Sequence, residues 1–109
     1  MDLGGNNFMK RIINGKLYNT DTATCLGSYQ FSIPGNFHYL CEDLYRKKNG
    51  EFFLFGEGGA ASKYSVKTDT NEWSSGKTII PLTVDEAKKW AEEYLPADDY
   101  IEVFGEPSE

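Results

Sequence analysis

The stretch that decides the fold is residues 44–59, LYRKKNGEFFLFGEGG. Asn49-Gly50 at its centre is the favoured pair for a two-residue turn, and strand-forming residues flank it on both sides. With this pair at the tip of a hairpin, Lys48 lies opposite Glu51, where the two charges can pair. Residues 52–55 are apolar on both faces, so they are predicted to form a central strand that is covered on both sides.

This register also sorts the apolar side chains of the hairpin onto two faces, because side chains alternate along a strand. One face is predicted to carry Leu44, Phe53 and Phe55, and the other Tyr45, Phe52 and Leu54.

The glycines that follow have the spacing of a dinucleotide-binding loop, Gly56-x-Gly58-x-x-Ala61. That loop requires a helix directly after it, whereas residues 62–66 favour a strand. We therefore expect the glycines to allow a sharp turn or a close approach to a helix. Glu57 is then an exposed acidic residue in a loop.

The remaining β-structure is predicted from turn residues and strand formers. A second Asn-Gly hairpin is expected over 11–18, and a strand over 22–31. Further extended segments are expected over 63–67 and 78–83, with residues 67–78 as a polar loop between them.

The clearest element is a helix over 84–95, which begins at a capping box formed by Thr83 and Glu86. Apolar residues then recur at three- and four-residue spacing until Pro96 ends the helix. Residues 100–105, YIEVFG, alternate and are predicted to form a short strand or an extended tail.

Together these elements predict an α+β fold, in which an antiparallel sheet of about four to five strands carries one main C-terminal amphipathic helix on a face. The 109 residues suffice for one domain. We expect a tail at 1–8, a single domain over 9–105 and an acidic tail at 106–109.

Location is predicted from what the chain lacks. It has no apolar run long enough to cross a membrane and no basic-then-apolar start typical of a signal peptide. Cys25 and Cys41 are therefore interpreted as reduced thiols in a cytoplasm.

Charge is distributed unevenly along the chain. Residues 85–109 contain nine acidic and two basic residues, a net charge of −7, whereas the other 84 residues contain eight acidic and nine basic residues, a net charge of +1. Such a segment repels nucleic acid and attracts basic surfaces. The alternative is a solvated helix face followed by a soluble tail.

The sequence contains few side chains that could act in catalysis or bind a metal ion. His38, Cys25 and Cys41 would be three zinc ligands, but no C-x-x-C pair anchors such a site, so we expect no metal and no cofactor. The carboxylates lie in polar, solvated contexts. The chain is therefore predicted not to be an enzyme.

Nucleic-acid binding would need Arg46, Lys47 and Lys48, which form the basic part of the central hairpin. Alternation sends Arg46 and Lys47 to opposite faces, and the net charge of −6 is wrong for a phosphate binder. This interpretation is kept as an alternative.

Four blocks of the sequence resemble short proteins from phages and mobile elements of gut Firmicutes. The blocks are INGKLYNTDTA (13–23), LYRKKNGEFFLFGEGGAASKY (44–64), IIPLTVDEAKKWAEEYL (79–95) and IEVFGE (101–106), so the resemblance spans residues 9–106. Small acidic proteins from this setting include anti-CRISPR proteins, which bind a Cas effector nuclease and block guide loading, DNA binding or cleavage.

This resemblance implies a small acidic inhibitor that acts in the cytoplasm of a bacterial host cell and binds a basic protein partner. A Cas9-type effector is favoured because it holds nucleic acid in positively charged channels. No motif transfers a binding residue, so the expected contacts are chosen by charge. They are Glu57, Glu92, Glu93, Asp98, Asp99 and Glu102. The alternative function is a regulatory or antitoxin-like module that binds nucleic acid weakly through the basic hairpin. Unpaired edge strands of the sheet make a homodimer a further alternative.

Overall fold

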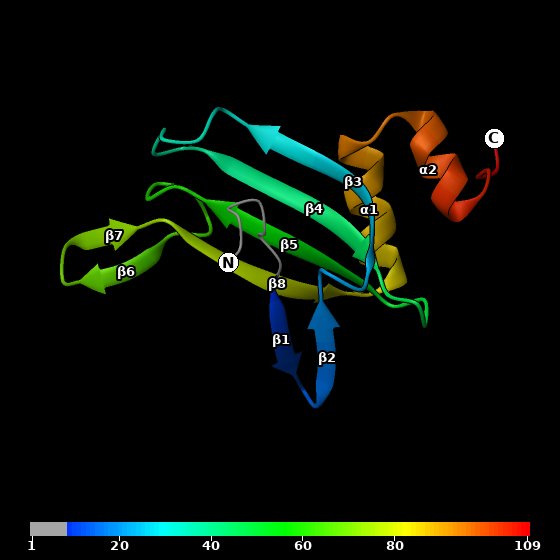
Figure 1. Cartoon of the computed structure of the whole chain (residues 1–109). Helices are drawn as coiled ribbons and strands as arrows, with labels where there is room; N and C mark the ends of the chain where they lie inside the picture. The colour runs from blue at the N-terminus through cyan, green and yellow to red at the C-terminus, as the bar shows by residue number, and fades with distance from the viewer. Residues whose placement is uncertain (1–8) are drawn as a thin grey trace.

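A computed structural model describes residues 9–109 and has the predicted α+β architecture (Figure 1). The predicted tail at 1–8 lies outside these residues. Four antiparallel strands form the main sheet in the order β3-β4-β5-β8, and two separate hairpins, β1–β2 and β6–β7, extend from it. The elements are β1 Lys10–Ile13, β2 Lys16–Asn19, β3 Thr24–Phe31, β4 Leu40–Arg46, β5 Phe52–Gly58, β6 Val66–Asp69, β7 Glu72–Ser74, β8 Gly76–Leu82, α1 Val84–Tyr94 and α2 Ala97–Phe104.

The central hairpin forms as predicted, but its register is shifted by one residue. The Lys47 amide donates to the Glu51 carbonyl at 2.8 Å, and the Gly50 amide donates to the Lys47 carbonyl at 2.9 Å. The loop therefore has three residues, with Gly50 at a φ of 95°. The predicted pairing of Lys48 with Glu51 is wrong, because Lys47 takes that place.

The shifted register moves the residues of β4 to the opposite faces. Leu44 lies opposite Leu54, and Tyr45 lies opposite Phe53. Leu44 therefore shares a face with Phe52 and Leu54, which corrects the two predicted sets.

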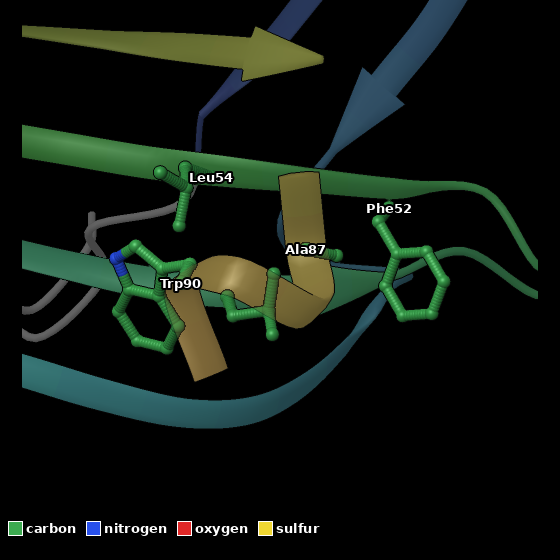
Figure 2. Close-up of a cluster of buried hydrophobic side chains, with 5 residues drawn as sticks. Phe52, Leu54, Ala87 and Trp90 are labelled. Carbon is green, nitrogen blue, oxygen red and sulfur yellow. The ribbon is translucent and has the colours of Figure 1, made fainter. Parts of the chain in front are cut away.

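Residues 52–55 are all buried, which confirms the prediction of a central strand with both faces covered. Phe52 and Leu54 pack on one face against Ala87 and Trp90 of α1 (Figure 2). On the other face, Phe53 and Phe55 pack with Tyr18 of β2 and Ile79 of β8. Two cores therefore share one strand, with α1 over the first and the β1–β2 hairpin over the second.

The first Asn-Gly hairpin is also confirmed. Asn14 and Gly15 have φ values of 52° and 76°, as a two-residue turn of this type requires. β3 confirms the predicted strand over 22–31.

The segment between β5 and β8 differs from the prediction. The expected strand over 63–67 starts only at Val66, because residues 63 and 64 are in a turn, and the expected polar loop over 67–78 contains most of the hairpin β6–β7 and the start of β8. Asp69 Oδ1 accepts a 2.7 Å hydrogen bond from the Thr70 amide and helps close the hairpin turn. Glu72 and Ser74 are polar residues in a strand exposed to solvent, so hydrophobic alternation gave no signal here.

α1 begins at the predicted capping box, in which Thr83 and Glu86 each accept a backbone hydrogen bond from the other. The prediction for residues 100–105 is wrong, because residues 97–104 form the helix α2. Val103 and Phe104 pack against the core beneath α1, and this tertiary contact outweighs the short alternating pattern. Within residues 9–109, neither helix is long and apolar enough to span a membrane.

Candidate partner-binding surface

Five acidic side chains lie on the two C-terminal helices and the turn between them. Glu92 and Glu93 are in the last turn of α1, Asp98 and Asp99 are in the first turn of α2, and Glu102 follows one turn later. All five are exposed. We call this set the acidic helical surface. Among residues 9–109 the ion pairs are Lys16–Glu51, Lys47–Glu51 and Lys63–Glu42, so none of them neutralises this surface.

The position of Glu92 and Glu93 is unfavourable for the helix that carries them. The C-terminal end of a helix bears partial negative charge and favours cations, but the last turn of α1 contains no basic residue. Asp98 and Asp99, by contrast, sit at the favourable end of α2. Two of the five acids therefore lie where the dipole of their own helix disfavours negative charge.

A buried carboxylate holds α1 against the sheet. Glu42 of β4 is only 1% exposed and accepts three hydrogen bonds. The donors are Trp90 Nε1 of α1 at 2.8 Å, Tyr64 Oη at 2.5 Å and Lys63 Nζ at 2.7 Å. Burial raises the pKa of Glu42, but the bonds from Lys63, Tyr64 and Trp90 outweigh it and hold the pKa below its ordinary value. The helix that carries two of the five acids of the acidic helical surface is thus fixed in place.

Gly56 makes room for this network. A Cβ at Gly56 would overlap the ring of Tyr64, which lies over β5. Burial and the neighbouring Glu42 carboxylate raise the pKa of Tyr64. Gly56 and Gly58 lie within β5 rather than in a turn or against a helix, which corrects the predicted reason for these glycines.

The sequence analysis missed Glu42, Lys63, Tyr64 and Trp90 as a group. Glu42 stands in a strand between Cys41 and Asp43, and nothing in that local pattern separates it from a solvated acid. A glycine in the middle of an apolar strand is a signal for close approach of another group, but it does not identify that group.

Glu57 does not belong to the acidic helical surface. It lies in β5 rather than in a loop, on the face opposite α1, with Cys41 and Lys77 as its strand neighbours. Tyr39 Oη donates to its Oε2 at 3.3 Å. Burial, followed by the charges and hydrogen bonds of its neighbours, raises the pKa of Tyr39 to about 12.

Glu57 lines a hollow of about 710 Å³ at the end of the sheet that is remote from the central hairpin loop. Phe37 and Trp73, both exposed, stand on its walls, and Lys77 adds a positive charge. The structure therefore separates Glu57 from the other five predicted partner-binding residues.

The basic hairpin is partly occupied by contacts within the chain. Lys47 Nζ lies 2.9 Å from Glu51 Oε1 and 3.7 Å from the centre of the Tyr18 ring. Lys16 Nζ lies 2.6 Å from Glu51 Oε2, and hydrogen bonds from both lysines lower the pKa of Glu51 to about 2. Lys48 is exposed, and Arg46 points to the α1 side of the sheet. The three cations therefore do not form one continuous surface.

The cysteines show no sign of activation. Burial and the charge of Asp43 raise the pKa of Cys41 to about 11, so its nucleophilic thiolate form is scarce at neutral pH. The pKa of the more exposed Cys25 is raised for the same two reasons. In the part of the chain that the structure describes, no three His, Cys, Asp or Glu side chains are placed to hold a metal ion.

Comparison with protein-family models, with curated proteins and with solved structures found no match to this chain.

Proposed function

We propose that the protein is a small inhibitor that binds a basic surface of another protein through the acidic helical surface. The observation that carries this proposal is five exposed carboxylates without an ion-pair partner among residues 9–109, on two helices of which α1 is fixed to the sheet by the Glu42 network. Two of these carboxylates oppose the dipole of α1. Exposed acids that the helix dipole disfavours and that form no ion pair within residues 9–109 can bind a basic surface of a partner.

The proposed partner is a Cas effector nuclease of the Cas9 type, and the proposed action is that of an anti-CRISPR protein. Such an effector holds nucleic acid in positively charged channels. The acidic helical surface would take the place of the phosphate backbone in one of these channels and block nucleic-acid binding or cleavage. Complementary charge would also speed the encounter, so association should weaken as salt rises.

The test compares two variants that change net charge by the same amount. The first carries Glu92→Lys and Glu93→Lys. The control carries Asp21→Lys and Glu72→Lys, two acids that are exposed and lie outside the two helices. Each purified protein is added to a guide-loaded Cas9-type effector, and target-DNA cleavage and pull-down are measured on the same samples.

We expect the wild-type and control proteins to bind and inhibit, and the helix variant to lose both activities while it keeps its melting temperature. Equal binding by the two variants would contradict the proposed role of the acidic helical surface. Absence of binding by the wild-type protein would contradict the proposed partner. Salt-sensitive DNA or RNA binding that is lost in Arg46→Ala and Lys48→Ala would instead support a nucleic-acid-binding module.

A further inference from the structure

The main sheet has two outer strands, and the structure protects them differently. β8 contains Lys77 and Pro81, and Arg11 Nη1 reaches Thr78 Oγ1 on this strand at 3.0 Å. Lysine, proline and covering side chains are the usual devices that prevent another strand from pairing with an edge. β8 is therefore a poor site for strand addition.

β3, the other outer strand, lacks these devices. Its eight residues, TCLGSYQF, include no charged residue and no proline. A bulge between Cys25 and Gly27 interrupts only its first part. Residues 27–31 then pair regularly with β4, and their outer side forms no backbone hydrogen bond with any other element within residues 9–109. This stretch presents a row of unpaired backbone groups.

The outer side of β3 is also exposed at the level of side chains. Ser28 and Gln30 are exposed on one face of the strand. Phe31 on the other face is 53% exposed, although it is a large apolar residue. An added strand would cover Phe31 as well as the backbone groups.

The acidic helical surface lies directly beside this edge. Tyr94, the last residue of α1, stacks on Tyr29 of β3 with ring centres 4.2 Å apart, and Leu95 contacts Gly27. Figure 1 shows the C-terminal end of α1 passing β3, with α2 beginning on the same side of the sheet. A strand added to β3 would therefore run next to Glu93 and the start of α2.

We infer that residues 27–31 of β3 are a strand-addition site for an extended basic segment of the partner. This inference rests on the proposed function and specifies how the partner is bound. The edge of β3 forms backbone hydrogen bonds with the added strand, and the acidic helical surface attracts its basic side chains. A second copy of the chain is the wrong occupant. If the β3 strands of two copies paired, the acidic segments 85–109 of both copies would lie close together. Each segment has a net charge of −7, so the two copies would repel each other.

The test uses a defined probe, a ten-residue peptide that alternates lysine and valine, and follows backbone amide signals of the protein by NMR. Binding is expected to shift the amides of residues 27–31 and of the end of α1. One control peptide replaces each lysine with glutamate. A second keeps the lysines but carries an N-methyl group on every internal residue, which removes the hydrogen-bond donors from both edges of the peptide without changing its charge.

Both controls are expected to bind at least tenfold more weakly than the lysine–valine peptide. Equal binding of the N-methylated peptide, or shifts that leave out residues 27–31, would overturn strand addition. This outcome is distinct from a failure of the proposed function, since the peptide experiment involves no effector nuclease.

Two proline variants of the protein, Gln30→Pro and Phe31→Pro, test whether the outward amides of β3 bind the peptide. Successive amides of a strand point to opposite sides, so one of these variants removes an outward donor and leaves the β3–β4 ladder intact. That variant is recognised by its unchanged melting temperature, and we expect it to lose at least tenfold in peptide affinity. Unchanged affinity would overturn the inference. So would a concentration-dependent dimer that the same substitution abolishes, because the edge would then serve a second copy.

Discussion

The carboxylate of Glu42 and the carboxylates of Glu92 and Glu93 have opposite surroundings. Glu42 is buried and accepts hydrogen bonds from Trp90, Tyr64 and Lys63. Glu92 and Glu93 are exposed, form none of the ion pairs within residues 9–109, and lie at the unfavourable end of their helix. The buried acid is surrounded by hydrogen-bond donors, whereas the two exposed acids, which we propose bind a partner, form no ion pair within residues 9–109.

Substitutions at the two sites should differ most in how far they lower the free energy of unfolding. Glu42→Gln replaces a buried acceptor with a group that also presents donors to Tyr64 and Lys63, so it should lower the free energy of unfolding by about 3 kcal/mol. The matched change Glu93→Gln at an exposed site should cost less than about 0.5 kcal/mol. Urea denaturation of both variants measures the two values. Equal effects would remove the distinction between the two sites.

The Glu42 network can also be broken without changing a polar group. Gly56→Ala places a methyl group against the Tyr64 ring and should destabilise the fold by about 2 kcal/mol, as overpacking commonly does. In a Tyr64→Ala background the same change should cost much less, because the ring is absent. Urea denaturation of the four proteins in this cycle gives the coupling. Additive effects would show that Gly56 acts independently of Tyr64.

Acid should destabilise the fold through Glu42 and Glu51. The pKa of Glu42 is lowered in the folded protein, and that of Glu51 is lowered to about 2. Both groups therefore stabilise the fold above the ordinary glutamate pKa of about 4.3, and this contribution is lost as pH falls from there towards about 2. Denaturation at a series of pH values checks this, with Glu51→Gln expected to reduce the slope. A stability that rises on acidification through this range would contradict the assignment.

Much of the fold was predictable because local signals agreed with it. Asn14-Gly15, the capping box of Thr83 and Glu86, and the apolar run at 52–55 each identified an element. The register of the central hairpin was missed because Asn49-Gly50 also suits a three-residue loop, which Gly50 closes here. α2 was missed because its stability comes from contacts of Val103 and Phe104 with residues distant in the sequence.

The candidate site was only partly predictable for a similar reason. Charge counts identified Glu92, Glu93, Asp98, Asp99 and Glu102, since these acids are close together in the sequence. Glu42 and Trp90 are 48 residues apart, so only the folded chain brings them together. Glu57 was predicted to be an exposed loop acid in the same partner-binding set, because its charge is evident from the sequence but the extension of β5 to Gly58 is not.

The most direct test of the central claim needs no partner, because it asks whether the acids of the helical surface serve the fold. Glu92→Lys and Glu93→Lys replace anions with cations at the C-terminal end of α1, where the helix dipole favours positive charge. Lys88 and Lys89 lie four residues before these positions, so each substitution also replaces a favourable i,i+4 charge pair with a repulsive one. The two effects are of similar size and opposite sign, so the free energy of unfolding of the double variant should stay within about 0.5 kcal/mol of the wild-type value in urea denaturation. A clear loss of stability would show that Glu92 and Glu93 stabilise the folded chain and would contradict the account.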